Sequence, residues 1–142
     1  MIEAIRPEGV ADVWQAARSA LAQSIAYTGE RNEHDLLCQL VTGNAQLWRV
    51  YDGWAVTEII PYPRRRVACL SLFGGKFNRH AVREMRAVLY AWAKHYHADE
   101  IRVIGRRGWL KFLPEANEYT VLSICLPHPS HTTPLTQSAP VA

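Results

Sequence analysis

The sequence contains few cysteines. Its 142 residues include three cysteines, Cys38, Cys69 and Cys125, which are far apart and each lie in an apolar stretch. This spacing predicts reduced core residues and excludes a disulfide framework. His95 and His97 have no cysteine or glutamate at ligand spacing, so we expect no metal site.

The chain also has no apolar run long enough to cross a membrane, and no strong net charge. The segment Met1-Ile2-Glu3-Ala4-Ile5 does not resemble a signal peptide, so we expect synthesis inside a cell and no membrane association. The formal net charge is +3. A charge this small does not by itself indicate nucleic-acid binding.

Hydrophobic periodicity predicts two helices near the N-terminus, after a short strand over residues 2–6. Apolar residues recur at helical spacing between 7 and 23. Asn32 is a suitable N-cap for a second helix, with Glu33 and Asp35 in its first turn, and Gly43 is a suitable C′ residue.

The pattern then changes to strands. Segments 45–51 and 54–60 flank Asp52-Gly53, a hairpin signal. Residues 67–73 are almost entirely apolar, as in a central strand, and end at a glycine pair. After these come a helix capped by Asn78 with a strong apolar stripe, a strand at 101–104, a short helix at 108–113 and a last strand at 119–126.

This order predicts one α/β domain over residues 1–126, with a mixed central sheet and helices on both faces. Residues 127–142 form a tail rich in proline, serine and threonine, with no core-forming pattern.

The predicted order resembles the GNAT superfamily of acyl-CoA N-acyltransferases. The resemblance rests on Ile5-Arg6-Pro7 before the first helix, the three-strand meander, the strand–glycine–helix unit around Gly74, and the short helix after Gly108. The stretch from Gly105 to Trp109, and Trp54-Ala55-Val56-Thr57-Glu58, are similar to small phage-encoded GNAT-like proteins, including a virion protein of podophages.

The resemblance implies an acetyl-CoA site where the central strand meets the next helix. There, GNAT enzymes place a glycine-spaced loop whose N–H groups hold the pyrophosphate. In this chain the corresponding residues are Phe73, Gly74, Gly75, Lys76 and Arg79. The glycines come early and are adjacent, so the resemblance implies that the usual loop is altered.

The resemblance also implies a catalytic base and an acid. Glu58 is the only carboxylate that the two central strands offer as a base, and segment 109–113 contains no tyrosine to act as the acid. The sequence therefore departs from the family pattern at both the cofactor loop and the acid.

Arginines cluster in two short segments. Three of them are expected at a hairpin tip and two beside the last short helix: Arg64, Arg65, Arg66, Arg106 and Arg107. Such groups either form a solvated surface or pair with the phosphates or carboxylates of a partner.

Three functions follow from these patterns. The first is a non-catalytic GNAT-fold phage protein in the virion or its assembly, which contacts other phage structural proteins or further copies of itself, with its tail extended on a neighbour. In that case no cofactor is needed, and the protein moves from the host cytoplasm to the virion. The second is an acetyl-CoA-dependent N-acetyltransferase. The third is a phage effector that binds a host protein.

Overall fold

The computed structural model describes residues 1–105 and 107–127 of the chain, with the side chain of Arg107 left out. Its elements, in chain order, are β1 (Ile2–Ile5), a 3₁₀ turn η1 (Pro7–Gly9), α1 (Val10–Thr28), α2 (Glu33–Val41), β2 (Gln46–Val50), β3 (Gly53–Tyr62), β4 (Arg65–Gly75), α3 (Arg79–His95), β5 (Glu100–Val103) and a 3₁₀ helix η2 (Arg107–Lys111). None of the described helices is long and apolar enough to span a bilayer.

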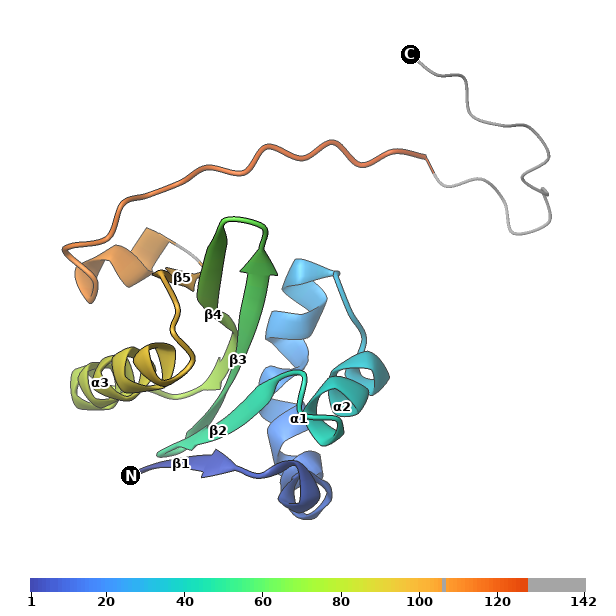
Figure 1. The fold of residues 1–142 in the computed structure, drawn as a ribbon. Helices are drawn as coiled ribbons and strands as arrows, with labels where there is room; N and C mark the ends of the chain where they lie inside the picture. Colours follow the sequence, from blue (N-terminus) through green and yellow to red (C-terminus); the bar gives the residue numbers. More distant parts are fainter. Residues whose placement is uncertain (106, 128–142) are drawn as a thin grey trace.

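A single five-stranded sheet organises the domain. Its strands lie in the order β1-β2-β3-β4-β5, with antiparallel neighbours except for the parallel pair β4 and β5. Helices α1 and α2 cover one face and α3 covers the other (Figure 1). The predicted mixed α/β sheet with helices on both faces is confirmed.

The helix caps form as the sequence predicts. The Asn32 side chain accepts a hydrogen bond from the Asp35 N–H, and the Asp35 carboxylate accepts one from the Asn32 N–H. Asn78 caps α3 by accepting from the Ala81 N–H at 2.8 Å. These bonds satisfy N–H groups that have no partner inside their helices.

Helix α1 is longer than predicted. The sequence indicates an end near residue 23, but the helix continues to Thr28 and stops at Gly29, whose φ is +63°. Ile25 is buried and extends the stripe that Ala17 and Leu21 begin, so packing against the sheet stabilises another turn.

The long strand β4 contains one extra residue relative to its neighbour β3. Val56 pairs with Leu72 and Thr57 pairs with Leu70, so Ser71 is skipped in the register. A β-bulge of this kind bends a strand and re-aims the side chain at the bulge. The bulge at Ser71 directly follows Leu70, the last residue of β4 that pairs with β5.

The glycine pair forms the last two residues of β4, so the strand ends at these glycines as predicted. A Cβ on Gly74 would come within 2.0 Å of the Ala20 carbonyl oxygen in α1. Gly75 has a φ of +109° and lies against Gly53 of β3. Both glycines therefore permit close backbone approach within the fold.

Two further predictions are wrong. Residues 116–127, which include the expected last strand, belong to no helix or strand. Only Cys69 is a core residue; Cys38 and Cys125 are exposed. Cys38 lies on the outer face of α2, away from the buried Leu36 and Leu40, so its apolar sequence context was misleading.

Candidate active site

A cleft opens where β5 turns away from β4. The two strands pair only from Val67 to Leu70, and the last contact is the Ile104 N–H donating to the Leu70 carbonyl at 3.2 Å. β4 continues to Gly75 with β3 as its one strand partner in the described chain. The other edge of β4 therefore carries backbone groups that an extended ligand can reach.

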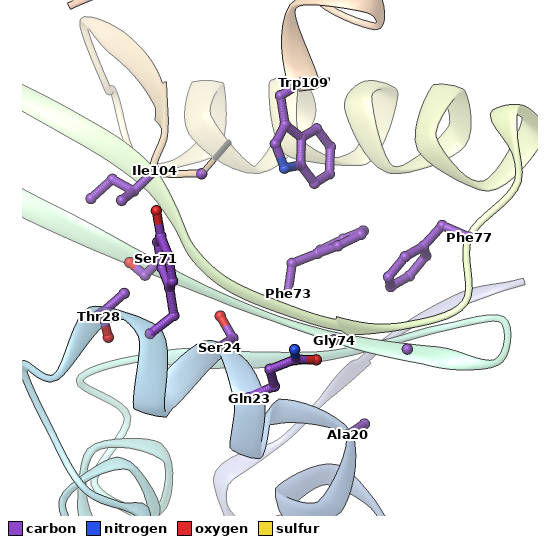
Figure 2. Close-up of a pocket in the computed structure, with 13 residues that line it drawn as sticks. Ala20, Gln23, Ser24, Thr28, Ser71, Phe73, Gly74, Phe77, Ile104 and Trp109 are labelled. Carbon is purple, nitrogen blue, oxygen red and sulfur yellow. The ribbon is translucent and has the colours of Figure 1, made fainter. Parts of the chain in front are cut away.

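The cleft has a volume of about 340 Å³, within the range of small-molecule sites. Helix α1 forms one side, and Trp109 and Ile104 lie on the other, with Ser71 and Phe73 of β4 between them (Figure 2). The α1 side is mostly polar, and its residues are Ala20, Gln23, Ser24, Tyr27 and Thr28.

Three aromatic rings line the part of the cleft that lies towards α3. The Phe73 and Phe77 rings stack with centroids 3.7 Å apart, and Trp109 meets Phe73 edge-on at 4.9 Å. Trp109 also lies against Gly105, where a Cβ would come within 2.8 Å of its ring. The rings give the cleft an apolar wall opposite the polar residues of α1.

A chain of hydrogen bonds runs from the cleft into the domain. The Ser71 hydroxyl lines the cleft and donates to the Glu58 carboxylate at 3.0 Å. The other carboxylate oxygen of Glu58 pairs with Arg31, whose guanidinium also donates to Gln39 at 2.9 Å. Only 16% of the Glu58 side chain and 12% of the Arg31 side chain are exposed.

Glu58 therefore lies on the α1–α2 face of the sheet, which the sequence did not reveal. Glu58 is not among the residues that line the cleft. Ser71, which does line it, connects Glu58 to the cleft through its hydrogen bond. Cys69 pairs with Glu58 in the register, and burial raises the pKa of its thiol. A buried thiol of this kind is protonated and a poor nucleophile at neutral pH.

The start of α3 carries positive charge. Lys76 and Arg79 are exposed, and the first turn of the helix contains no acidic residue. The free N–H groups and the helix dipole add to the attraction for an anion at this end. Phe77, between these two residues, turns inwards against Phe73 and Gly53.

Two of the arginines expected to bind a partner make contacts within the domain. The Arg65 side chain pairs with Glu100 at 2.9 Å, and Arg66 donates to the Tyr96 carbonyl at 2.7 Å, so both hold the hairpin to the end of α3 and to β5. Arg64 is exposed at the turn. Arg106 and the side chain of Arg107 lie outside the described part of the chain.

The sequence did not identify the polar side of the cleft or the ion pair behind it. Gln23 ends the predicted helix, and Ser24, Thr28 and Arg31 follow it, so helical spacing gave no reason to place them at a site. The signal that could have indicated this side of the cleft was the set of polar residues in the last turn of α1. Among the described residues, no three His, Cys, Asp or Glu side chains group as a metal site would require.

No family model and no curated protein matches the sequence. Solved structures do match the fold. An aminoglycoside acetyltransferase from an uncultured soil metagenomic sample is 15% identical, with a TM-score of 0.61, and the match covers 91% of this chain and 98% of that one. The ribosomal-protein-alanine N-acetyltransferase of Brucella melitensis biovar Abortus 2308 is 14% identical, with a TM-score of 0.59 and coverages of 89% and 99%.

A third structure includes a ligand. It is a predicted acetyltransferase with acetyl-CoA from Clostridium acetobutylicum, 13% identical, with a TM-score of 0.60 and coverages of 88% and 95%. The chain has the GNAT acetyltransferase fold. The predicted resemblance at the level of the fold is therefore confirmed, whereas none of these three structures is described as a phage protein.

Proposed function

We propose that this protein is an N-acyltransferase that uses acetyl-CoA or a related acyl-CoA. The observation that carries the proposal is the cleft between β4 and β5, whose bulge residue Ser71 is hydrogen-bonded to Glu58. Several solved structures with the same fold are described as acetyltransferases, which supports an enzyme better than a structural protein.

The residues at the cleft suit the two halves of an acyl-CoA. The pantetheine arm carries amides, which match the open backbone edge of β4 beyond Leu70, and its apolar carbons match the wall of Phe73 and Trp109. The phosphates match Lys76 and Arg79 at the start of α3. Of the predicted set, Phe73, Gly74 and Gly75 line the cleft, and Lys76 and Arg79 follow them in the chain where α3 begins.

The bound acyl-CoA would supply an acyl group activated as a thioester. Transfer would form a bond from the acceptor nitrogen to the acyl carbon and break the carbon–sulfur bond, so that CoA leaves as its thiolate, and the nitrogen would lose a proton. Ser71 is placed to accept that proton while passing its own to Glu58, so the carboxylate acts as a base through the hydroxyl. Arg31 holds the carboxylate in place.

A binding measurement tests whether the protein binds acetyl-CoA. We expect acetyl-CoA to bind with a Kd near the micromolar range, about 8 kcal/mol, in a calorimetric titration. The double variant Lys76→Ala/Arg79→Ala should weaken binding about tenfold. Lys94→Ala, at the other end of α3, is the matched control and should bind as the wild type does.

S-Acetylpantetheine, which lacks the nucleotide phosphates, should bind the wild type and the double variant equally. No heat with acetyl-CoA up to millimolar concentration would contradict the proposed function.

Activity tests the proton path. With an accepting amine found by a thiol-release screen, Ser71→Ala and Glu58→Gln should each lower kcat by about 100-fold, the lower range for general-base catalysis, with acetyl-CoA affinity unchanged. Ser19→Ala on the exposed face of α1 is the control. Unchanged rates in both cleft variants would rule out this path without affecting the cofactor result.

The virion role and the host-protein role remain predictions. They rest on the phage-like stretches around Trp54 and Gly105, on the altered cofactor loop and on the C-terminal tail. Particles purified from an infected culture would contain the protein if the virion role is correct, and its absence from them would count against that role.

A further inference from the structure

The lining of the cleft contains no charged side chain among the described residues. Its polar side chains, four hydroxyls and one amide, belong to Gln23, Ser24, Tyr27, Thr28 and Ser71. The rest of the lining consists of aromatic rings, aliphatic side chains and glycines (Figure 2). A cationic group would find no carboxylate in this lining, and burying an unpaired ion is costly.

The charges around the cleft do not supply a partner for a cation either. Glu58 reaches the cleft through Ser71, and both Glu58 and the exposed Glu30 pair with the guanidinium of Arg31. At the opposite end, the start of α3 is positive. An ammonium group in the cleft would therefore meet paired carboxylates at one end and like charge at the other.

The proton path from the cleft has room for one proton. Ser71 leads to the single carboxylate of Glu58, and no described carboxylate or imidazole lines the cleft itself. A neutral amine loses one proton when it attacks a thioester. An ammonium must lose another proton beforehand to expose its lone pair, and the described lining offers no second base for that step.

Two exposed apolar residues flank the cleft. Tyr27 belongs to the α1 side and Ile104 to the side of β5, and they are 70% and 49% exposed. Phe73 and Trp109 suit the pantetheine arm, so Tyr27 and Ile104 are left for the body of the acceptor. Exposed apolar side chains beside a cleft favour an apolar ligand.

We propose that the acyl acceptor is an aromatic amine that is uncharged at neutral pH. In such a compound the nitrogen lone pair is delocalised into the ring, which keeps the nitrogen unprotonated. The ring lies against Tyr27 and Ile104, and the nitrogen lies beside the Ser71 hydroxyl. Transfer joins this nitrogen to the acyl carbon, CoA leaves as its thiolate, and the amine proton passes through Ser71 to Glu58. This inference rests on the proposed function, because it names the acceptor of the same transfer.

Two amines with rings of equal size test the role of charge. Aniline is uncharged at neutral pH, and cyclohexylamine is protonated. With acetyl-CoA as the donor and CoA release as the readout, kcat/KM for aniline should exceed that for cyclohexylamine by at least about 100-fold. Unprotonated cyclohexylamine is the stronger nucleophile, so a preference for aniline reports the site and not the intrinsic reactivity of the amine.

A carboxylate placed beside the cleft should change this preference. Ile104→Asp gives a cation a partner, so kcat/KM for cyclohexylamine should rise about tenfold. Ile104→Asn has nearly the same size without the charge, and it should not raise this rate. Both variants should raise KM for aniline, because both remove the apolar contact. Val41→Asp, at an exposed position of α2, places the same charge elsewhere and should leave both rates unchanged.

The outcomes separate this inference from the proposed function. A wild-type kcat/KM for cyclohexylamine that equals or exceeds that for aniline would overturn the inference. Equal rates with cyclohexylamine in Ile104→Asp and Ile104→Asn would also overturn it. Acetyl-CoA binding without transfer to millimolar aniline would overturn it too, while the cofactor site would stand. Absence of acetyl-CoA binding would contradict the proposed function itself, and the inference with it.

Discussion

Gly74 is required because of what lies opposite its α-carbon. The Ala20 carbonyl oxygen of α1 would be 2.0 Å from a Cβ at this position, so the helix can approach β4 only over a glycine. The same close approach sets α1 beside the cleft, where Ser24 and Thr28 line it. One glycine thus determines both the packing of the helix and the width of the site.

Replacing this glycine should destabilise the fold. We expect Gly74→Ala to lower the free energy of unfolding by about 2–3 kcal/mol, because α1 must move outwards to avoid the new methyl group. Urea unfolding measures the change. Gly108→Ala is the control: apart from its chain neighbours and the backbone of its own helical turn, no described atom lies within 4 Å of the new methyl group, so stability should change by less than about 1 kcal/mol. Equal effects of the two substitutions would contradict the steric explanation.

At the scale of elements, the parallel pair of β4 and β5 determines where the cleft begins. Only four register pairs join the two strands, from Val67–Glu100 to Leu70–Val103. Side chains at the hairpin end strengthen this short pairing: Arg65 pairs with Glu100, and the Arg66 N–H donates to Asp99. The basic hairpin therefore fixes the position of β5.

The pair at the start of β5 should make stability depend on pH. The hydrogen bond from Arg65 holds the pKa of the Glu100 carboxyl below its ordinary value of 4.5. A lowered pKa in the folded state stabilises the protein above the ordinary value, and this contribution is lost as pH falls through the lowered pKa.

We therefore expect Arg65→Met to lower the free energy of unfolding by up to about 1 kcal/mol near neutral pH, since the pair is partly exposed. The difference from wild type should shrink in acid. Chemical unfolding between pH 7 and pH 3 measures it, with the exposed Arg64→Met as the control. A difference that stays constant with pH would show that the substitution acts through packing.

At the scale of the whole molecule, one sheet separates two hydrophobic clusters. The first joins α1 and α2 to the sheet and contains Leu21 and Leu36, which are fully buried. The second joins α3 to the other face and contains Met85 and Leu89. Since both clusters need the same strands, neither half of the core can form alone.

The shared sheet should make unfolding cooperative. We expect Leu21→Ala and Met85→Ala, on opposite faces, each to lower the free energy of unfolding by about 2–5 kcal/mol. In each variant, far-UV circular dichroism and tryptophan fluorescence should report the same midpoint, because Trp54 and Trp48 belong to opposite clusters. Midpoints that differ between the two probes would show that the two faces unfold separately.

The sequence alone determined the features that depend on near neighbours in the chain. The caps at Asn32 and Asn78 and the stripe along α3 were predicted correctly, because a helix needs only residues within a turn or two. The nearly continuous apolar run of β4 identified a central strand, and the order of elements then led to the fold.

The tertiary structure decided what depends on register and on distant segments. The bulge at Ser71, the pairing of Glu58 with Arg31, and the contact of Gly74 with α1 all join residues that are far apart in sequence. The predicted strand at 119–126 was wrong for the same reason. A local apolar pattern gives a segment the capacity to form a strand, but hydrogen bonds to a neighbouring strand make it one, and in the described chain this segment pairs with no strand.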